Sequence, residues 1–117
     1  MFFIMKYNQQ LYAAARPTTL AVQRRDDVGA TQSAAAMSAT ARVLADQAAS
    51  KASSPLISGN DQVYASMARQ ALMVSEAGRL IASADLRNGT FDRAVYQRRA
   101  ALLSSALSSR SSGLPKH

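Results

Sequence analysis

The most regular pattern of apolar and polar positions lies in the second half of the chain. From Val63 to Ile81 the apolar residues recur every three or four positions, and on a helical wheel they fall within about 80° of one another. This stripe consists of Val63, Met67, Ala71, Val74, Gly78 and Ile81. The pattern predicts a helix that is capped by Gly59, Asn60 or Asp61, and an acidic side chain in its first turn suits the positive end of the helix dipole.

A second helix is predicted immediately before it, from Thr31 to Ser53. Its apolar seam follows the alternating three- and four-residue spacing of a coiled-coil contact and consists of Ala34, Met37, Ala41, Leu44 and Ala48. Most of these residues are small, which lets two helix axes approach closely. Pro55 ends the helix, and the short loop after it reverses the chain. We therefore predict an antiparallel helical hairpin in which the small seam faces the bulkier stripe.

The residues before this hairpin predict an extended aromatic helix. Apolar residues from Ile4 to Leu11 have helical spacing, Pro17 ends the pattern, and four of the chain's seven aromatic residues lie in this stretch. We interpret residues 1–17 as an anchoring helix that docks on a partner or on a membrane surface. The absence of acidic residues before Asp26 is also typical of mitochondrial targeting peptides, an interpretation that we rank lower.

A fourth helix is predicted from Phe91 to Ser109, with Thr90 as its cap. It carries two apolar stripes. The first consists of Phe91, Val95, Leu102 and Ala106, and the second of Tyr96, Ala100, Leu103, Leu107 and Leu114. One stripe would face the hairpin, which leaves the other for a second chain.

Together these elements predict an all-α protein. We expect an antiparallel helical hairpin or a three- to four-helix arrangement, with an extended N-terminal anchoring helix and a Ser-rich tail. The predicted divisions are the anchoring helix 1–17, a linker 18–30, the hairpin with the basic C-terminal helix 31–109, and the tail 110–117, whose composition is typical of disorder.

The composition indicates that such a fold is weakly stabilised by its own core. The 117 residues include 24 alanines and 15 serines, but only 23 residues of Leu, Ile, Val and Phe. An alanine methyl buries little apolar area, so it offsets only a small part of the entropy lost on folding. We therefore expect the chain to be stabilised by partner subunits.

The charge of the chain is strongly basic, with 14 Lys and Arg residues against 7 Asp and Glu residues and a formal net charge of +7. No acidic residue follows Asp92, so the basic side chains of the C-terminal helix are uncompensated. These arginines are the candidate contacts to nucleic acid or to an acidic partner: Arg93, Arg98, Arg99 and Arg110.

The sequence offers little for catalysis or metal binding. It has no Cys, one Glu, and a single His at position 117, so the usual nucleophile–base pairs and metal-ligand clusters cannot be assembled. Asp26 and Asp27 are adjacent, and adjacent side chains diverge in regular structure. No phosphate-binding glycine loop and no apolar run of about 18 residues occurs. We expect a non-enzyme without cofactor or metal and without a transmembrane helix.

These observations favour a non-catalytic structural or assembly subunit, ordered within a larger complex such as a virion or a secretion apparatus. In composition the chain resembles the Ala-, Gln-, Ser- and Arg-rich internal or adaptor proteins of tailed bacteriophages, which implies a location in a virion or the cytoplasm. The alternative is a basic helical nucleic-acid-binding protein. Expected partners are other subunits, including further copies of this chain, with nucleic acid as an alternative and membrane-surface contact ranked below both. The candidate partner-binding residues are Phe2, Phe3, Tyr7, Leu11, Tyr12, Tyr96, Leu103 and Leu107.

Overall fold

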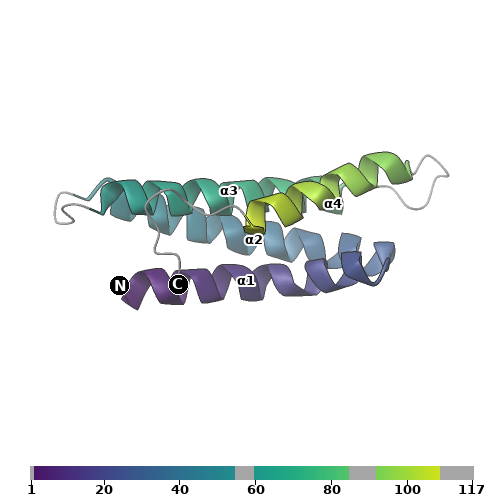
Figure 1. The fold of residues 1–117 in the computed structure, drawn as a ribbon, viewed down its shortest axis with the longest axis horizontal. Coiled ribbons are helices and arrows are strands. Elements are labelled where there is room, and N and C mark those ends of the chain that lie inside the picture. The colour runs from purple at the N-terminus through teal and green to yellow at the C-terminus, as the bar shows by residue number, and fades with distance from the viewer. Residues whose placement is uncertain (1, 55–59, 85–91, 109–117) are drawn as a thin grey trace.

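The computed structural model describes residues 2–54, 60–84 and 92–108. It contains four helices: α1 (Phe2–Gln23), α2 (Asp27–Ala52), α3 (Asp61–Ala82) and α4 (Arg93–Ser108). No strand occurs in the described residues, so the predicted all-α class is confirmed. The helices form an elongated bundle of 52 × 24 × 19 Å, in which α4 is short and covers only part of the bundle's length (Figure 1).

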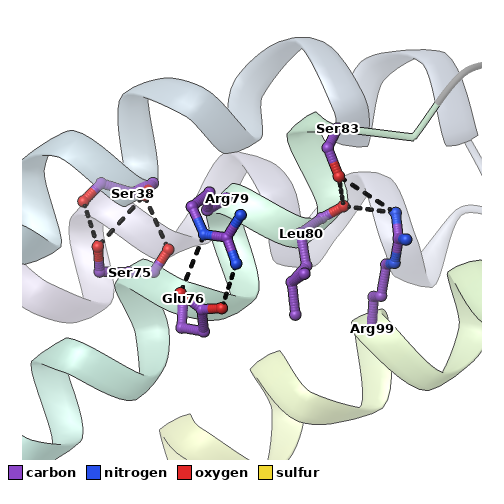
Figure 2. Close-up of polar contacts among 7 residues, drawn as sticks. All are labelled: Ser38, Ser75, Glu76, Arg79, Leu80, Ser83 and Arg99. Atoms are coloured by element: carbon purple, nitrogen blue, oxygen red, sulfur yellow. Dashed lines mark hydrogen bonds and ion pairs between the residues drawn. The ribbon is translucent and has the colours of Figure 1, made fainter.

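The longest contact in the bundle is between α2 and α3, which run antiparallel. Gly78 of α3 lies against Ala34 of α2. A Cβ atom added to Gly78 would lie 2.9 Å from the carbonyl oxygen of Ala34. Ser38 follows Ala34 by four residues in α2. Its hydroxyl donates to the carbonyl of Ser75 at 2.7 Å, and the Ser75 hydroxyl donates to the carbonyl of Ser38 at 3.0 Å (Figure 2). Small residues therefore bring the two backbones within reach of each other's side chains.

Alanine makes up half of the buried apolar residues. Every residue of the α2 seam is buried, as are all residues of the α3 stripe except Val63, which is half-buried. The larger buried side chains are Ile4, Tyr7, Leu11, Met37, Leu44, Tyr64, Met67, Val74, Ile81, Tyr96 and Leu103. The core is thus continuous but thin, and α1, α3 and α4 supply most of its bulk.

Helix α1 continues through Pro17 to Gln23, so the predicted stop at Pro17 is wrong. A proline inside a helix removes one hydrogen bond and crowds the carbonyl four residues earlier. Here both Pro17 and Ala13 lie on the exposed face, where water can solvate that carbonyl. Beyond the proline, Thr18 and Ala21 are buried, and Thr18 shares a 2.7 Å hydrogen bond with the Ser33 hydroxyl of α2. Tertiary packing therefore outweighs the local effect of the proline.

The predicted linker 18–30 is replaced by a tight turn over residues 24–26. The amide of Asp26 donates to the carbonyl of Ala21 at 2.8 Å, and Arg25 has a positive φ of 59°. These are the features of a Schellman motif, in which glycine is the usual residue at the position of Arg25. The Asp26 carboxylate then accepts from the amide of Gly29 at 2.9 Å and caps α2.

Helix α4 is anchored mainly on α3. The Gln70 side-chain amide donates to the carbonyl of Ala106 at 3.1 Å, and the Asp92 carboxylate accepts from the amide of Ala94 at 2.9 Å at the start of the helix. Asp92 therefore caps α4, while the predicted cap Thr90 and the Ser-rich tail 110–117 lie outside the described residues.

Candidate protein-binding groove

A groove runs between α1 and α4, the two helices that come together at the open side of the bundle. These helices have few close approaches, whereas α4 packs closely on α3. The groove consists of two adjoining recesses of about 580 and 400 Å³, which share Val22, Ala100 and Ser104 as lining residues. Ala100 and Ser104 have small side chains and line both recesses. Larger side chains at these two positions would fill the space between α4 and α1, so their small size explains why the groove is open.

The smaller recess is apolar. Leu103 forms its floor and is only 2% exposed, and Val22 and Leu107 are half-buried beside it. Thr19 also lines this recess, and its hydroxyl is buried without a hydrogen-bond partner in the described residues.

Tyr12 of α1 contacts α4 beside the groove, at Leu107. Its hydroxyl donates to the carbonyl of Leu107 at 2.6 Å, yet the residue is 47% exposed. Met5, seven residues earlier and therefore on the same face of α1, is 63% exposed.

The larger recess has a cationic end formed by Arg25 and Arg93. Arg93 forms an ion pair with Asp27 at 3.0 Å, which ties the first turn of α4 to the first turn of α2. Tyr96 is buried at this end, and its burial, followed by the negative charge of Asp27, raises the pKa of its hydroxyl. Arg25 is exposed, and it has no ion-pair partner among the described residues.

The two helices that bound the groove contain no acidic residue. α1 carries Lys6 and Arg16, and α4 carries Arg93, Arg98 and Arg99. By contrast, α2 and α3 each carry two acidic and two basic residues. The excess positive charge of the helical bundle therefore belongs to the α1–α4 side.

The aromatic residues at the start of α1 pack inside the chain's own bundle. Tyr7 is 1% exposed and donates its hydroxyl to the carbonyl of Met67 at 2.9 Å, and its burial raises the pKa of that hydroxyl well above the ordinary value. Leu11 is fully buried. Phe3 is half-buried, with its ring centroid 5.6 Å from that of Tyr64 and with the Lys51 ammonium 4.5 Å above the ring. The expected extended anchor is therefore a packed helix, because α2 and α3 offer it an apolar face.

Three of these predicted partner-binding residues are thus core residues or packed against the core, and the Phe2 side chain lies outside the described residues. Tyr96 and Leu103 are also buried, because the second apolar stripe of α4 faces the bundle. Leu103, Leu107 and Tyr12 nevertheless border the groove. The first stripe faces outward in part, with Leu102 47% exposed.

The candidate arginines have different environments. Arg99 donates from Nη1 to the carbonyl of Leu80 at 2.8 Å and to the Ser83 hydroxyl at 3.3 Å, and so satisfies the C-terminal end of α3 (Figure 2). Arg93 is paired with Asp27, as described above. Arg98 is exposed, and Arg110 lies outside the described residues.

The sequence prediction missed Thr19, Val22 and Arg25 as lining residues because it assigned them to the linker. A signal was present: Ala15, Thr18 and Val22 continue the three- and four-residue spacing of α1 across Pro17. Reading that spacing through the proline extends the apolar stripe of α1 to the groove.

Comparison of the chain with protein-family models, with curated proteins and with solved structures found no match. No helix in the described part of the chain is long and apolar enough to cross a membrane. The described residues also contain no group of three or more His, Cys, Asp or Glu side chains placed to hold a metal ion.

Proposed function

We propose that this chain is a non-catalytic structural subunit of a larger complex and that it binds another protein through the α1–α4 groove. The observation that carries the proposal is the open apolar recess over Leu103, in a bundle whose own core is half alanine. A chain with so few large apolar residues gains stability when a partner side chain fills such a recess.

The acidic residues of the described helices support a non-catalytic role, because most of them have structural partners. Asp27, Asp46 and Glu76 form ion pairs with arginines, and Asp26 and Asp92 cap helices. A carboxylate held in such a contact is a poor general acid or base, since its lone pairs are occupied.

The environments of the arginines favour a protein partner over nucleic acid. Arg93 is bound to a carboxylate and Arg99 to a helix terminus, so two of the three described candidates already have partners within the chain. Nucleic acids bind proteins largely through contacts between phosphates and free cationic side chains. A recessed apolar floor adds nothing to such contacts.

The proposal is tested by filling the groove and measuring the size of the complex. Ser104 and Ser105 are neighbouring exposed serines on α4, but only Ser104 lines the groove. We expect Ser104→Trp to release the chain from its complex, while the matched control Ser105→Trp leaves the complex intact. The measurement is the mass of the tagged chain by light scattering, after isolation from the cells that produce it.

The expected result is a 12.5 kDa monomer for Ser104→Trp and a larger particle for the wild type and for Ser105→Trp. A large particle with Ser104→Trp would contradict the proposal. A complex that contains only nucleic acid, shown by its absorbance ratio, would favour the alternative of a nucleic-acid-binding protein.

A further inference from the structure

We infer that the occupant of the α1–α4 groove is an amphipathic helix of a different protein, with acidic residues beside its apolar stripe at the end that meets Arg25. This inference rests on the proposed function and adds the chemistry of the partner. It is argued from the shape of the groove and from the distribution of charge over the four helices.

The groove has the length and form of a helix-binding surface. Its lining residues on α4 run from Arg93 to Ser108, about 22 Å, which is close to four turns of a helix lying alongside. Its apolar floor is recessed, since Leu103 is 2% exposed while Val22 and Leu107 form the walls. Large side chains that project from a helix at three- and four-residue spacing can reach such a floor.

The charges select an acidic helix. α1 and α4 together carry five basic residues and no acidic residue, and Arg25 adds a further cation at the end of the groove. Of these cations, Arg25 and Arg93 line the groove at one end, and Arg25 has no ion-pair partner among the described residues. An acidic side chain on the partner's helix would lie beside Arg25 at this end, and such complementarity accelerates association and fixes orientation. Asp27 is already paired with Arg93, so the lining residues that the structure describes offer no free carboxylate to a basic partner.

The same charges disfavour a second copy of this chain as the occupant. A copy that docked with its own α1 or α4 would bring further basic residues and no acidic residue to the groove. Like charges placed opposite each other in an interface are unfavourable. The apolar stripes of α2 and α3 are buried in each copy. Both helices also expose apolar side chains, Val43 on α2 and Leu72 and Met73 on α3, but the acidic residues near them, Asp46 and Glu76, are already paired with arginines of the same helix.

A lipid surface fits the groove less well than a helix does. Peripheral membrane helices insert apolar side chains that protrude from the protein. The apolar residues here are recessed between two helices, where a flat bilayer cannot reach Leu103. The recess therefore requires an occupant with side chains that project into it.

The test is a selection from displayed helical peptides of about 20 residues. Their apolar heptad positions are fixed, and the flanking positions are varied among Glu, Gln and Lys. The library is selected on the full chain and depleted on Ser104→Trp. We expect the enriched peptides to have predominantly Glu at the flanking positions of one end and to bind at least tenfold more tightly than matched Lys peptides.

A charge variant with a neighbouring control sharpens the result. Arg25 lines the groove and Arg24 does not, although both are exposed and adjacent in sequence. Arg25→Gln should weaken binding of the selected acidic peptide about two- to fivefold, and this difference should shrink at high salt. Arg24→Gln should change the affinity less than twofold.

The outcomes separate this inference from the proposed function. Enriched peptides with neutral or basic flanks, still blocked by Ser104→Trp, would overturn the acidic partner and leave the groove as a binding site. Equal enrichment on the wild type and on Ser104→Trp would overturn both. Binding of duplex DNA or of anionic phosphatidylserine vesicles that Ser104→Trp abolishes would also overturn the inference, because the groove would then serve another class of ligand.

Discussion

The α2–α3 pair and the α1–α4 pair use small residues with opposite results. In the first pair, Gly78, Ser38 and Ser75 bring two backbones into contact, and the interface is closed. In the second pair, Ala100 and Ser104 leave a recess. The first pair is balanced in charge, and the second is purely basic. Small residues close an interface only where the facing helix fills the space, and in the second pair the side chains of α1 and α4 leave that space unfilled.

The largest expected effect comes from adding bulk to the closed interface. A side chain at Gly78 would meet the carbonyl of Ala34 and the Met37 side chain, both at 2.9 Å from its Cβ atom. Backbone cannot yield as a flexible side chain does, so we expect Gly78→Leu to lower the free energy of unfolding by about 3 kcal/mol. Urea denaturation monitored by circular dichroism measures the loss. A stability equal to that of the wild type would show that α2 and α3 are not closely apposed.

A smaller effect is expected from the polar bond that joins α1 to α3. Tyr7→Phe removes the hydroxyl that donates to the Met67 carbonyl and should cost about 1 kcal/mol in the same assay. Tyr12→Phe is the matched control, because its hydrogen bond to Leu107 is exposed and should contribute less. Equal losses in the two variants would contradict the deep burial of Tyr7.

Burial of Tyr7 also predicts a dependence of stability on pH. Its folded-state pKa is raised above the ordinary value of 10.0, so the neutral hydroxyl is favoured in the folded chain. This contribution is fully present below pH 10 and is lost as pH rises through the folded-state pKa. Unfolding measured between pH 8 and about 12 should therefore show a decline for the wild type that is shallower in Tyr7→Phe. Identical profiles would contradict this assignment.

Bulk added to the open pair should have the opposite sign. Ala100 lines both recesses of the groove, so the longer side chain of Ala100→Leu has space to enter. We expect the free energy of unfolding to rise by about 1 kcal/mol while partner binding falls, because the variant fills the partner's place. A destabilisation like that of Gly78→Leu would mean that the α1–α4 interface is already closed.

The smallest expected effect concerns the turn between α1 and α2. Arg25 has a positive φ of 59°, and this conformation costs a residue with a side chain about 1–2 kcal/mol. Glycine adopts it without this steric cost but loses more conformational entropy on folding. Arg25→Gly should therefore stabilise the free chain by about 0.5 kcal/mol. Arg24→Gly, within the same turn but without a positive φ, should not stabilise the chain. A loss of stability in Arg25→Gly would indicate that the Arg25 side chain has a structural role.

The sequence predicts the all-α class because apolar residues recur at helical spacing in every segment. It fails at Pro17 because the rule that proline ends a helix is local, while Thr18 and Ala21 are held by packing against the rest of the bundle. It likewise misreads Asp26 and Asp27 as part of a solvated linker, although Asp26 caps α2 and Asp27 lies in its first turn. At Pro17 a short-range propensity is outweighed by tertiary contacts, whereas the cap at Asp26 is itself a local contact, made with the amide of Gly29.

The groove is harder to predict than the helices. Periodicity shows that α4 has two apolar stripes, but it does not show which one faces the bundle, since either stripe is wide enough to pack. The structure turns Tyr96 and Leu103 inward and leaves Leu102 exposed. The recess depends further on how α1 and α4 lie relative to each other, which no property of either segment determines alone. By contrast, the sequence shows that α1 and α4 lack acidic residues once the bounds of the helices are known.

The most direct test of the central claim is site-specific photo-crosslinking inside the cell. A photoreactive phenylalanine analogue is placed at Ser104, on the groove, or at Ser105, on the neighbouring exposed position of the same helix. Adducts are then identified by mass spectrometry after irradiation. We expect a defined adduct with another protein from position 104, through an acidic helical segment, and no such adduct from position 105. Absence of a protein adduct at 104, or the same adducts from both positions, would contradict the assignment of the α1–α4 groove as a protein-binding surface.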